Sequence, residues 1–283
     1  MGLRITTNVA AMSAQRHLAN ATLRVNRSLE RLSSGLRINR AADDPAGLAM
    51  SERLRAQIRA LQVGERNAGD GISLLQIADG GLASVADLLV RMTELAEQAM
   101  TGTVTDEQRG YLDDEFQALV EEIDRVAASI DFNGRNLLDG TGGDTRIELG
   151  SGSAGSITLG LGSSFTSAAL GLDTLTLAGD PGSWAEQPLT AIRAAIQQVS
   201  SGRASFGASQ NRLESAIRLM QNQQENLAAA DSRIREVDYA AEISELTSAQ
   251  ILQQMAVAVL AQAQRQPALA LQLLGLDSRG RRA

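Results

Sequence analysis

The segment at residues 189–234, LTAIRAAIQQVSSGRASFGASQNRLESAIRLMQNQQENLAAADSRI, decides the fold. Alternating steps of three and four reach fourteen positions along it, and the apolar ones are Leu189, Ile192, Ile196, Val199, Phe206, Leu213, Ile217, Met220, Leu227 and Ile234. This spacing keeps one face of a helix apolar over several heptads. It predicts a helix over about 188–236, roughly 70 Å long at 1.5 Å per residue. Because a compact protein of this length has a radius of gyration of about 19 Å, such a helix indicates an elongated rod.

The first half of the chain repeats the pattern. A second apolar stripe runs from Leu54 to Ala99 and skips one step in a Gly-rich region. A third helix is expected to begin at Thr105, because Gln108 stands three residues later as in a capping box. Its stripe continues to Ile130.

Between residues 134 and 183 the composition changes to Gly and Ser. Apolar and polar residues alternate at Ile147–Leu149, Ile157–Leu161 and Leu175–Leu177, which predicts β-hairpins joined by Gly-rich turns. Gly150–Gly155 matches the spacing of a dinucleotide-binding loop, but that motif needs a helix directly after it. A strand-like segment follows instead, so a loop without a ligand is favoured.

Both ends of the chain are apolar and contain few large side chains that could anchor them in a core. Apolar residues fall almost all round the helix expected after Tyr239, so it needs several neighbours. The predicted fold class is mainly α: an elongated rod of long antiparallel, coiled-coil-like helices with a small β-hairpin insert, and terminal helices paired as a coiled coil. The expected domains are a terminal helical domain of residues 1–44 and 236–283, and a rod domain of residues 45–235 that contains the insert at 134–183.

Composition excludes many kinds of site. The chain has no Cys and one His, and all 26 of its basic residues are Arg. It therefore lacks a thiol nucleophile, a Schiff-base Lys and a His pair for a metal. We expect no enzyme activity, no catalytic residues, no metal and no cofactor.

Charge and hydropathy restrict the kinds of partner that the chain is expected to bind. Residues 1–44 carry seven Arg against three acidic residues, whereas the whole chain has a net charge of −7. A basic arm could bind nucleic acid, but Arg on the solvated face of an amphipathic helix is the favoured interpretation. No signal peptide and no apolar run of about 18 residues is visible, so neither a cleaved leader nor membrane insertion is expected.

Several segments resemble bacterial flagellins. They are Ile5–Ala11, Leu29–Asn39, Ala42–Gly47, Asn67–Leu74, Glu122–Val126, Phe132–Leu138, Ala230–Ala240 and Ala261–Ala263. Together they cover most of the chain outside the Gly-rich insert. The resemblance is to a short form without large outer domains.

The resemblance implies a structural subunit of the flagellar filament. Its termini would be disordered when free and would form coaxial helices in the filament core. The implied location is extracellular, reached by flagellar export without a cleavable signal peptide. The implied partners are further copies of the chain, an export chaperone on the C-terminal helix, the filament cap, the hook-junction proteins and the vertebrate flagellin receptor. A hook–filament junction protein is the alternative.

Three sets of residues are candidate sites. The candidate contacts in the filament core are Leu18, Leu29, Leu32, Leu36, Leu252, Met255, Val259 and Leu260. By resemblance, the candidate receptor contacts are Leu89, Arg91, Leu95 and Glu115, although packing is the alternative for Leu89. Candidate O-glycosylation sites are Ser163, Ser164, Thr166 and Ser167. The C-terminal extension at Leu276–Ala283 departs from the family pattern, and its role stays open.

Overall fold

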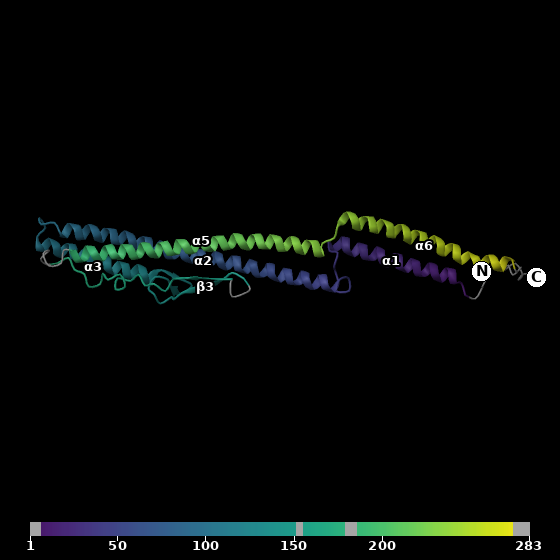
Figure 1. Cartoon of the computed structure of the whole chain (residues 1–283), viewed down its shortest axis with the longest axis horizontal. Coiled ribbons are helices and arrows are strands. Elements are labelled where there is room, and N and C mark those ends of the chain that lie inside the picture. The colour runs from purple at the N-terminus through teal and green to yellow at the C-terminus, as the bar shows by residue number, and fades with distance from the viewer. Residues whose placement is uncertain (1–6, 151–154, 179–185, 274–283) are drawn as a thin grey trace, which may run out of the picture. The chain divides into compact units, whose positions relative to one another are not determined.

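The computed structural model describes residues 7–150, 155–178 and 186–273 and is mainly helical (Figure 1). Its helices are α1 (Val9–Ser34), α2 (Pro45–Ala99), α3 (Asp106–Ser129), α5 (Glu186–Arg235) and α6 (Tyr239–Leu273). Its strands are β1 (Asp131–Phe132), β2 (Arg135–Asn136), β3 (Thr145–Glu148) and β4 (Ser156–Leu159). The predicted fold class is confirmed: long helices predominate, small antiparallel hairpins lie between them, and α1 pairs with α6.

The chain divides into two compact units. The first, the terminal unit, comprises Met1–Arg55 and Leu227–Ala283, and the second, the bundle unit, is Ala56–Asn226. These units end within α2 and α5. The beginning of α2 and the end of α5 are joined in the terminal unit: the Ser51 hydroxyl donates to Asp231 at 2.5 Å, and Arg235 pairs with Glu52 at 2.8 Å. The domains expected at residues 1–44 with 236–283 and at 45–235 stay a prediction.

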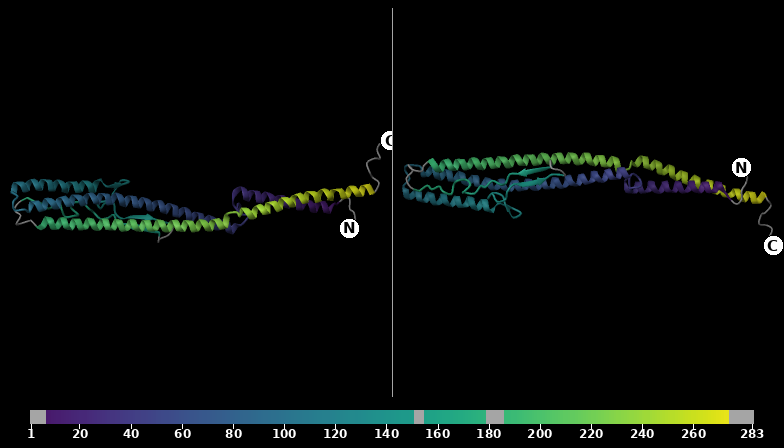
Figure 2. Two further views of the ribbon diagram at one scale, coloured as in Figure 1. Left: turned by 90° about the horizontal axis from the view of Figure 1, so that it is seen from above. Right: turned by 60° about the horizontal axis from the view of Figure 1, so that its bottom comes forward.

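In the bundle unit α2, α3 and α5 share one core (Figures 1 and 2). The α5 residues Ile192, Val199, Phe206, Leu213 and Met220 recur every seven positions, and each is at most 4% exposed. The heptad stripe of α5 is therefore confirmed. It packs against the stripes of α2 and α3 in a single cluster of buried residues.

Helix α2 is long and apolar enough to cross a membrane by composition, with a mean hydropathy of 1.4 over 18 residues. Its large residues Leu75, Leu82 and Leu89 are fully buried in the bundle core. The core therefore accounts for this apolar character without a bilayer.

Local sequence signals set the ends of α3. The Thr105 side chain accepts a hydrogen bond from the Gln108 amide, and the Gln108 side chain accepts one from the Thr105 amide, so the capping box is present. After α3 the chain turns through Asn133 and Gly134, whose φ values of 54° and 76° join β1 to β2. Asn-Gly is the residue pair that such a tight hairpin favours.

The Gly-rich insert contains one of the expected hairpins. β3 pairs antiparallel with β4, with Ile147 opposite Ile157. The segment Gly150–Gly155 joins these two strands, although residues 151–154 lie outside the described part. Because a strand rather than a helix follows it, the dinucleotide-loop interpretation is not supported.

The strand expected at Leu175–Leu177 is not formed. The backbone amide of Leu177 donates to the Asp113 carboxylate at 2.6 Å, and the Thr176 hydroxyl donates to the same side chain. The Leu177 amide is thereby occupied and cannot pair with a neighbouring strand, and both bonds hold the segment against α3 as a loop.

Gly64 in α2 allows the β3–β4 hairpin to approach the helix. A Cβ atom at this position would overlap the main-chain carbonyl of Leu149, directly after β3. Gly69, five residues further along the same helix, has no atom within 4 Å of such a Cβ. Gly64 is therefore required for packing, whereas Gly69 only weakens the helix.

These two glycines make a matched pair of substitutions. Gly64→Ala is expected to lower the free energy of unfolding by about 1–3 kcal/mol, because the hairpin must shift. Gly69→Ala is expected to raise it by about 0.5–1 kcal/mol, because Ala has the higher helix propensity. Urea unfolding followed by circular dichroism measures both. Equal effects of the two substitutions would contradict the close approach.

Candidate functional site

The terminal unit is built on a seam of small residues between α1 and α6. On α1 the buried residues are Ala14, Ala21, Val25 and Ser28. On α6 they are Glu242, Ala249, Ala256 and Ala263, spaced by seven. Small residues at heptad spacing let two helices approach closely along their length.

Polar contacts fix the antiparallel register of this seam. The Asn8 side-chain amide donates to the Ala263 carbonyl at 2.8 Å, and the Gln253 side-chain amide donates to the Thr22 hydroxyl at 3.0 Å. At the other end Arg31 pairs with Glu242 at 3.4 Å. Glu242 is the only charged residue among the four buried seam positions of α6.

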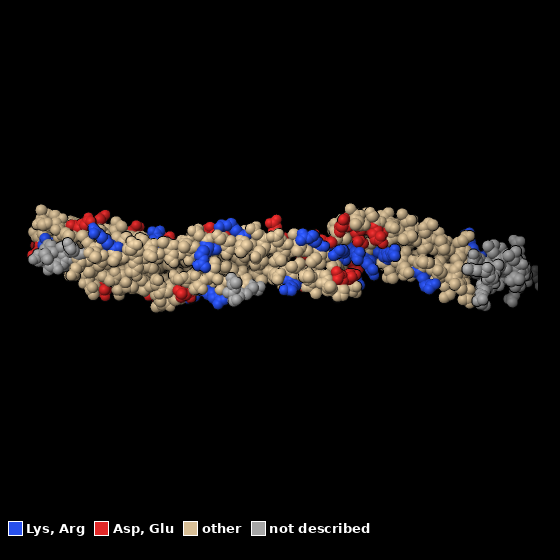
Figure 3. All heavy atoms as spheres, viewed as in Figure 1, with Lys and Arg blue, Asp and Glu red and all other residues tan. Residues whose placement is uncertain are grey.

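Backbone contacts tie the two helices together where they leave the seam. Gly35 ends α1 with a φ of 72°, and its carbonyl accepts a hydrogen bond from the Val237 amide at 3.0 Å. The Arg37 amide donates to the Arg235 carbonyl at 2.7 Å. Charged side chains gather in this region, whereas the rest of the α1–α6 surface is largely uncharged in the view of Figure 3.

Because the seam holds small residues, the large apolar residues of both helices point outward. We call this set the outer apolar surface, and its members are between 48% and 63% exposed: Val9, Met12, Leu23, Leu29, Tyr239, Ile243, Ile251, Leu252, Met255, Val257 and Val259. A soluble monomer rarely exposes so many large apolar residues in one region. The outer apolar surface of α1 and α6 is therefore the candidate interaction surface of the chain.

The candidate core contacts divide into two groups. Leu29, Leu252, Met255 and Val259 belong to the outer apolar surface, and the half-buried ones are Leu18, Leu32, Leu36 and Leu260. Leu252, Met255 and Val259 also line a groove of about 340 Å³ between the helices, with His17 and Arg24 on its other side. Other members, such as Met12 and Ile251, were not among the predicted contacts, because the prediction did not take account of the side of each helix that the small residues occupy.

The candidate receptor contacts are split between surface and core. Arg91 and Glu115 are exposed and 2.7 Å apart, and Arg91 also pairs with Glu94 at 2.9 Å. The hydrogen bond to Glu115, and then that to Glu94, raises the pKa of the Arg91 guanidinium above its ordinary value. For Leu89 and Leu95 the expectation is corrected. They are 0% and 1% exposed because both pack in the bundle core, so their side chains are not accessible to a partner in this structure.

The candidate glycosylation sites also differ in access. Ser163 is exposed, while Ser164 and Thr166 are half-buried and hydrogen-bonded to each other at 3.1 Å. For Ser167 the expectation is corrected, because its hydroxyl is buried and donates to Asp124 at 2.6 Å. That bond and the burial leave no room for a glycan on Ser167.

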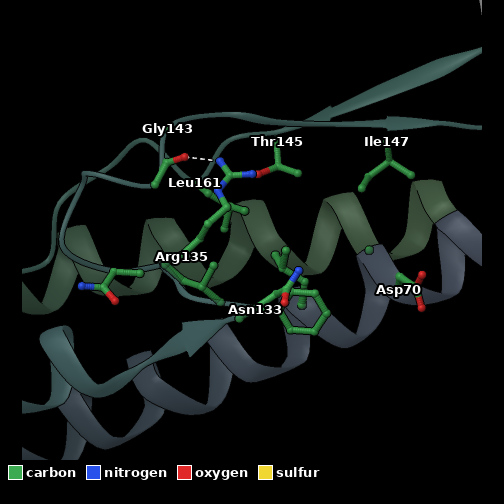
Figure 4. Close-up of a pocket in the computed structure, with 13 residues that line it drawn as sticks. Asp70, Asn133, Arg135, Gly143, Thr145, Ile147 and Leu161 are labelled. Carbon is green, nitrogen blue, oxygen red and sulfur yellow. Dashed lines mark hydrogen bonds between the residues drawn. The ribbon is translucent and has the colours of Figure 1, made fainter.

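One small cavity lies beside the β3–β4 hairpin (Figure 4). It measures about 180 Å³, and its lining includes Asp70, Phe132, Arg135 and Ile147. The Arg135 guanidinium is held by the Gly142 carbonyl. The cavity is smaller than most ligand pockets. Within the described ranges, no cluster of three His, Asp or Glu side chains could hold a metal.

Comparisons with known proteins agree on one family. A model of the bacterial flagellin N-terminal helical region matches residues 5–142, and a model of the bacterial flagellin C-terminal helical region matches residues 189–274. The flagellin of Halalkalibacterium halodurans is 45% identical over 95% of this chain and 99% of its own length. The flagellin of Bacillus subtilis is 41% identical over 96% of this chain and 100% of its own length.

Among solved structures, a putative flagellar hook-associated protein from Vibrio parahaemolyticus resembles the chain with a TM-score of 0.58. The match covers 69% of this chain and 100% of that one at 14% sequence identity. At this identity the likeness concerns the fold alone.

Proposed function

The chain belongs to the bacterial flagellin family and is a structural subunit of the flagellar filament, and we propose that the outer apolar surface of α1 and α6 is where its copies join. The observation that carries this proposal is the direction of the large apolar residues, which face outward along both helices. Covering them with neighbouring copies would remove apolar area from water. Order in these helices and assembly of the filament would then be coupled.

Contacts of this kind extend into a filament when they are heterologous. A surface that binds a different surface of the next copy does not close into a dimer, and it propagates helically. The alternative of a hook–filament junction protein is not favoured, because the flagellins cited above match the chain at 41–45% identity over nearly its full length.

The remaining partners follow from the same exposed helix. A single copy in the cytoplasm would leave the apolar residues of α6 uncovered, so α6 is the proposed binding site of an export chaperone. The filament cap and the hook-junction proteins would meet the same terminal helices at the two ends of a filament. The filament is extracellular, and the proposed route to it is flagellar export. Ser163 is the most accessible candidate for O-glycosylation, and no catalytic activity is proposed.

Substitutions in α6 test the assembly surface. Met255→Ser with Val259→Ser removes two outward apolar side chains, which contribute about 1.5–3 kcal/mol each when fully buried. The lowest concentration at which filaments grow from sheared seeds is expected to rise about 100-fold or more. Electron microscopy and sedimentation measure this, and the thermal unfolding of the bundle unit should not change.

The matched control removes two exposed apolar residues from the bundle unit, Ile77→Ser with Leu219→Ser. It is expected to change the growth concentration by about twofold or less, because isolated exposed apolar residues are common. If the control inhibits growth as strongly as the α6 variant, general loss of hydrophobicity would explain the result and the proposed surface would be wrong.

We also propose that the exposed ion-pair cluster of Arg91, Glu94 and Glu115 contacts the vertebrate flagellin receptor. Its support is the exposure of Arg91 and the fixed position that two carboxylates give its guanidinium. Arg91→Ala is expected to reduce receptor signalling by about tenfold in reporter cells, since one charge-assisted contact is lost. Arg125→Ala, which breaks a similar exposed pair with Glu122, is the control and should signal normally. Equal signalling by both variants and the unmodified chain would exclude the contact.

A further inference from the structure

Asn133 is the one Asn of the chain that a Gly follows, and the pair Asn133–Gly134 forms the turn of the β1–β2 hairpin. An Asn-Gly pair has a characteristic chemical reaction, in which the Gly amide nitrogen attacks the side-chain carbonyl carbon of Asn and expels ammonia. The succinimide ring that forms then takes up water and opens to Asp or to isoaspartate. Gly favours the attack because it places no side chain beside its nitrogen.

Both residues of this turn are accessible. Asn133 and Gly134 are exposed, and a Cβ atom at Gly134 would have no atom within 4 Å. The Asn133 side chain lines the small cavity of Figure 4 and forms no hydrogen bond within the described ranges. Its amide group is therefore free to rotate, and water can reach it.

The backbone of the turn opposes the reaction. Asn133 has a φ of 54° and is the one non-glycine residue with a positive φ in the part of the chain that the structure describes. Strand pairing on both sides of the turn fixes the peptide group between Asn133 and Gly134. Ring closure requires this peptide group to rotate toward the Asn133 side chain, so the hairpin must first open by local unfolding.

The Asp131 carboxylate is a second restraint. The Gly134 amide donates a hydrogen bond to it at 3.1 Å. The attack requires this amide to lose its proton, and a negative carboxylate beside the nitrogen raises the free energy of the nitrogen anion. Asp131 therefore protects the Asn133 side chain from attack while the hairpin is formed.

We propose that Asn133 is a deamidation site, and that the β1–β2 hairpin and Asp131 keep its reaction slow while the chain is folded. The bond between the Gly134 nitrogen and Asn133 Cγ forms, the Cγ–Nδ2 bond breaks, and ammonia leaves with the proton of the Gly134 amide. Water then adds to one of the two ring carbonyls and opens the ring. The reaction takes place within one copy and needs no cofactor, so it is independent of the proposed filament contacts.

The two products would alter the hairpin in different ways. Asp at position 133 adds a negative charge near the Asp131 carboxylate. Isoaspartate lengthens the backbone by one methylene group, which a two-residue turn does not accommodate. Because Phe132 of this hairpin packs against the bundle core, chains that carry isoaspartate are expected to unfold at a lower temperature than fresh chains.

Tryptic peptides separate the site from a matched control in the same chain. Cleavage after Arg places Asn133 in the peptide 126–135 and Asn136, which Leu follows, in the peptide 136–146. In urea at mildly alkaline pH, Asn133 is expected to convert at least about tenfold faster than Asn136, because Gly leaves the attacking nitrogen unshielded. In the folded chain the conversion of Asn133 is expected to be at least about tenfold slower than in urea. Mass spectrometry measures the conversion, and electron-transfer fragmentation identifies isoaspartate.

Asp131→Ala tests the second restraint. In the folded variant Asn133 is expected to convert about threefold faster than in the folded unmodified chain, because the Gly134 amide loses its acceptor. Asp144→Ala, which removes another exposed carboxylate, is the control and should leave the rate unchanged. In urea all three chains should react at the same rate, and circular dichroism shows whether each is folded before the comparison is made.

Each part of the inference has its own contrary result. Equal rates for Asn133 and Asn136 in urea would refute the deamidation site. Equal rates for Asn133 in the folded chain and in urea would refute protection by the hairpin, whether or not the Asp131 variant folds. A folded Asp131 variant that reacts no faster than the unmodified chain would refute the protective role of Asp131.

Discussion

The small-residue seam between α1 and α6 is the constraint on which the terminal unit depends. Residues such as Ala21 and Ala256 occupy the space between the helices, so their backbones lie close and the seam buries little apolar area. Many of the large apolar residues on the other sides of the helices, such as Met12 and Ile251, are then left facing water. Two helices share only one contact face, so they can bury the small residues on that face but not the large residues on their other sides. The seam therefore pairs the helices and, by the same geometry, leaves a surface that only other molecules can cover.

In the bundle unit, large apolar residues are buried within a single chain. There the heptad positions hold large residues such as Leu82, Phe116 and Phe206, and three helices with the hairpin enclose them. Under the proposed function, one subunit combines a bundle unit with a large apolar core of its own and a terminal unit whose apolar surface neighbouring copies would cover. In such a division the bundle unit would fold by itself, and the terminal unit would gain its remaining stability on assembly.

Local and periodic features could be predicted from the sequence. The heptad stripe of α5 and the capping box of α3 depend on residues within a few turns of each other, and the structure confirms them. Features set by distant residues could not. Ser167 is buried because Asp124, on another element, accepts its hydrogen bond, and no spacing rule reports that. The same holds for Leu177, whose amide donates to Asp113 of α3 and is therefore not available to a strand. The seam is a different case, because Ala249 and Ala256 recur every seven residues and the pattern was present in the sequence. It was missed because apolar residues fall almost all round the C-terminal helix, and the small ones among them were not considered separately from the large ones.

Amide hydrogen exchange, compared between the dilute monomer and the filament, tests the central claim most directly. The account predicts that the amides of α1 and α6 exchange quickly in the monomer, while those of α2, α3 and α5 in the bundle core are protected. In the filament all five helices should be protected. Protection of α1 and α6 in the monomer equal to that in the filament would show that the seam alone stabilises the terminal helices, and would contradict the account.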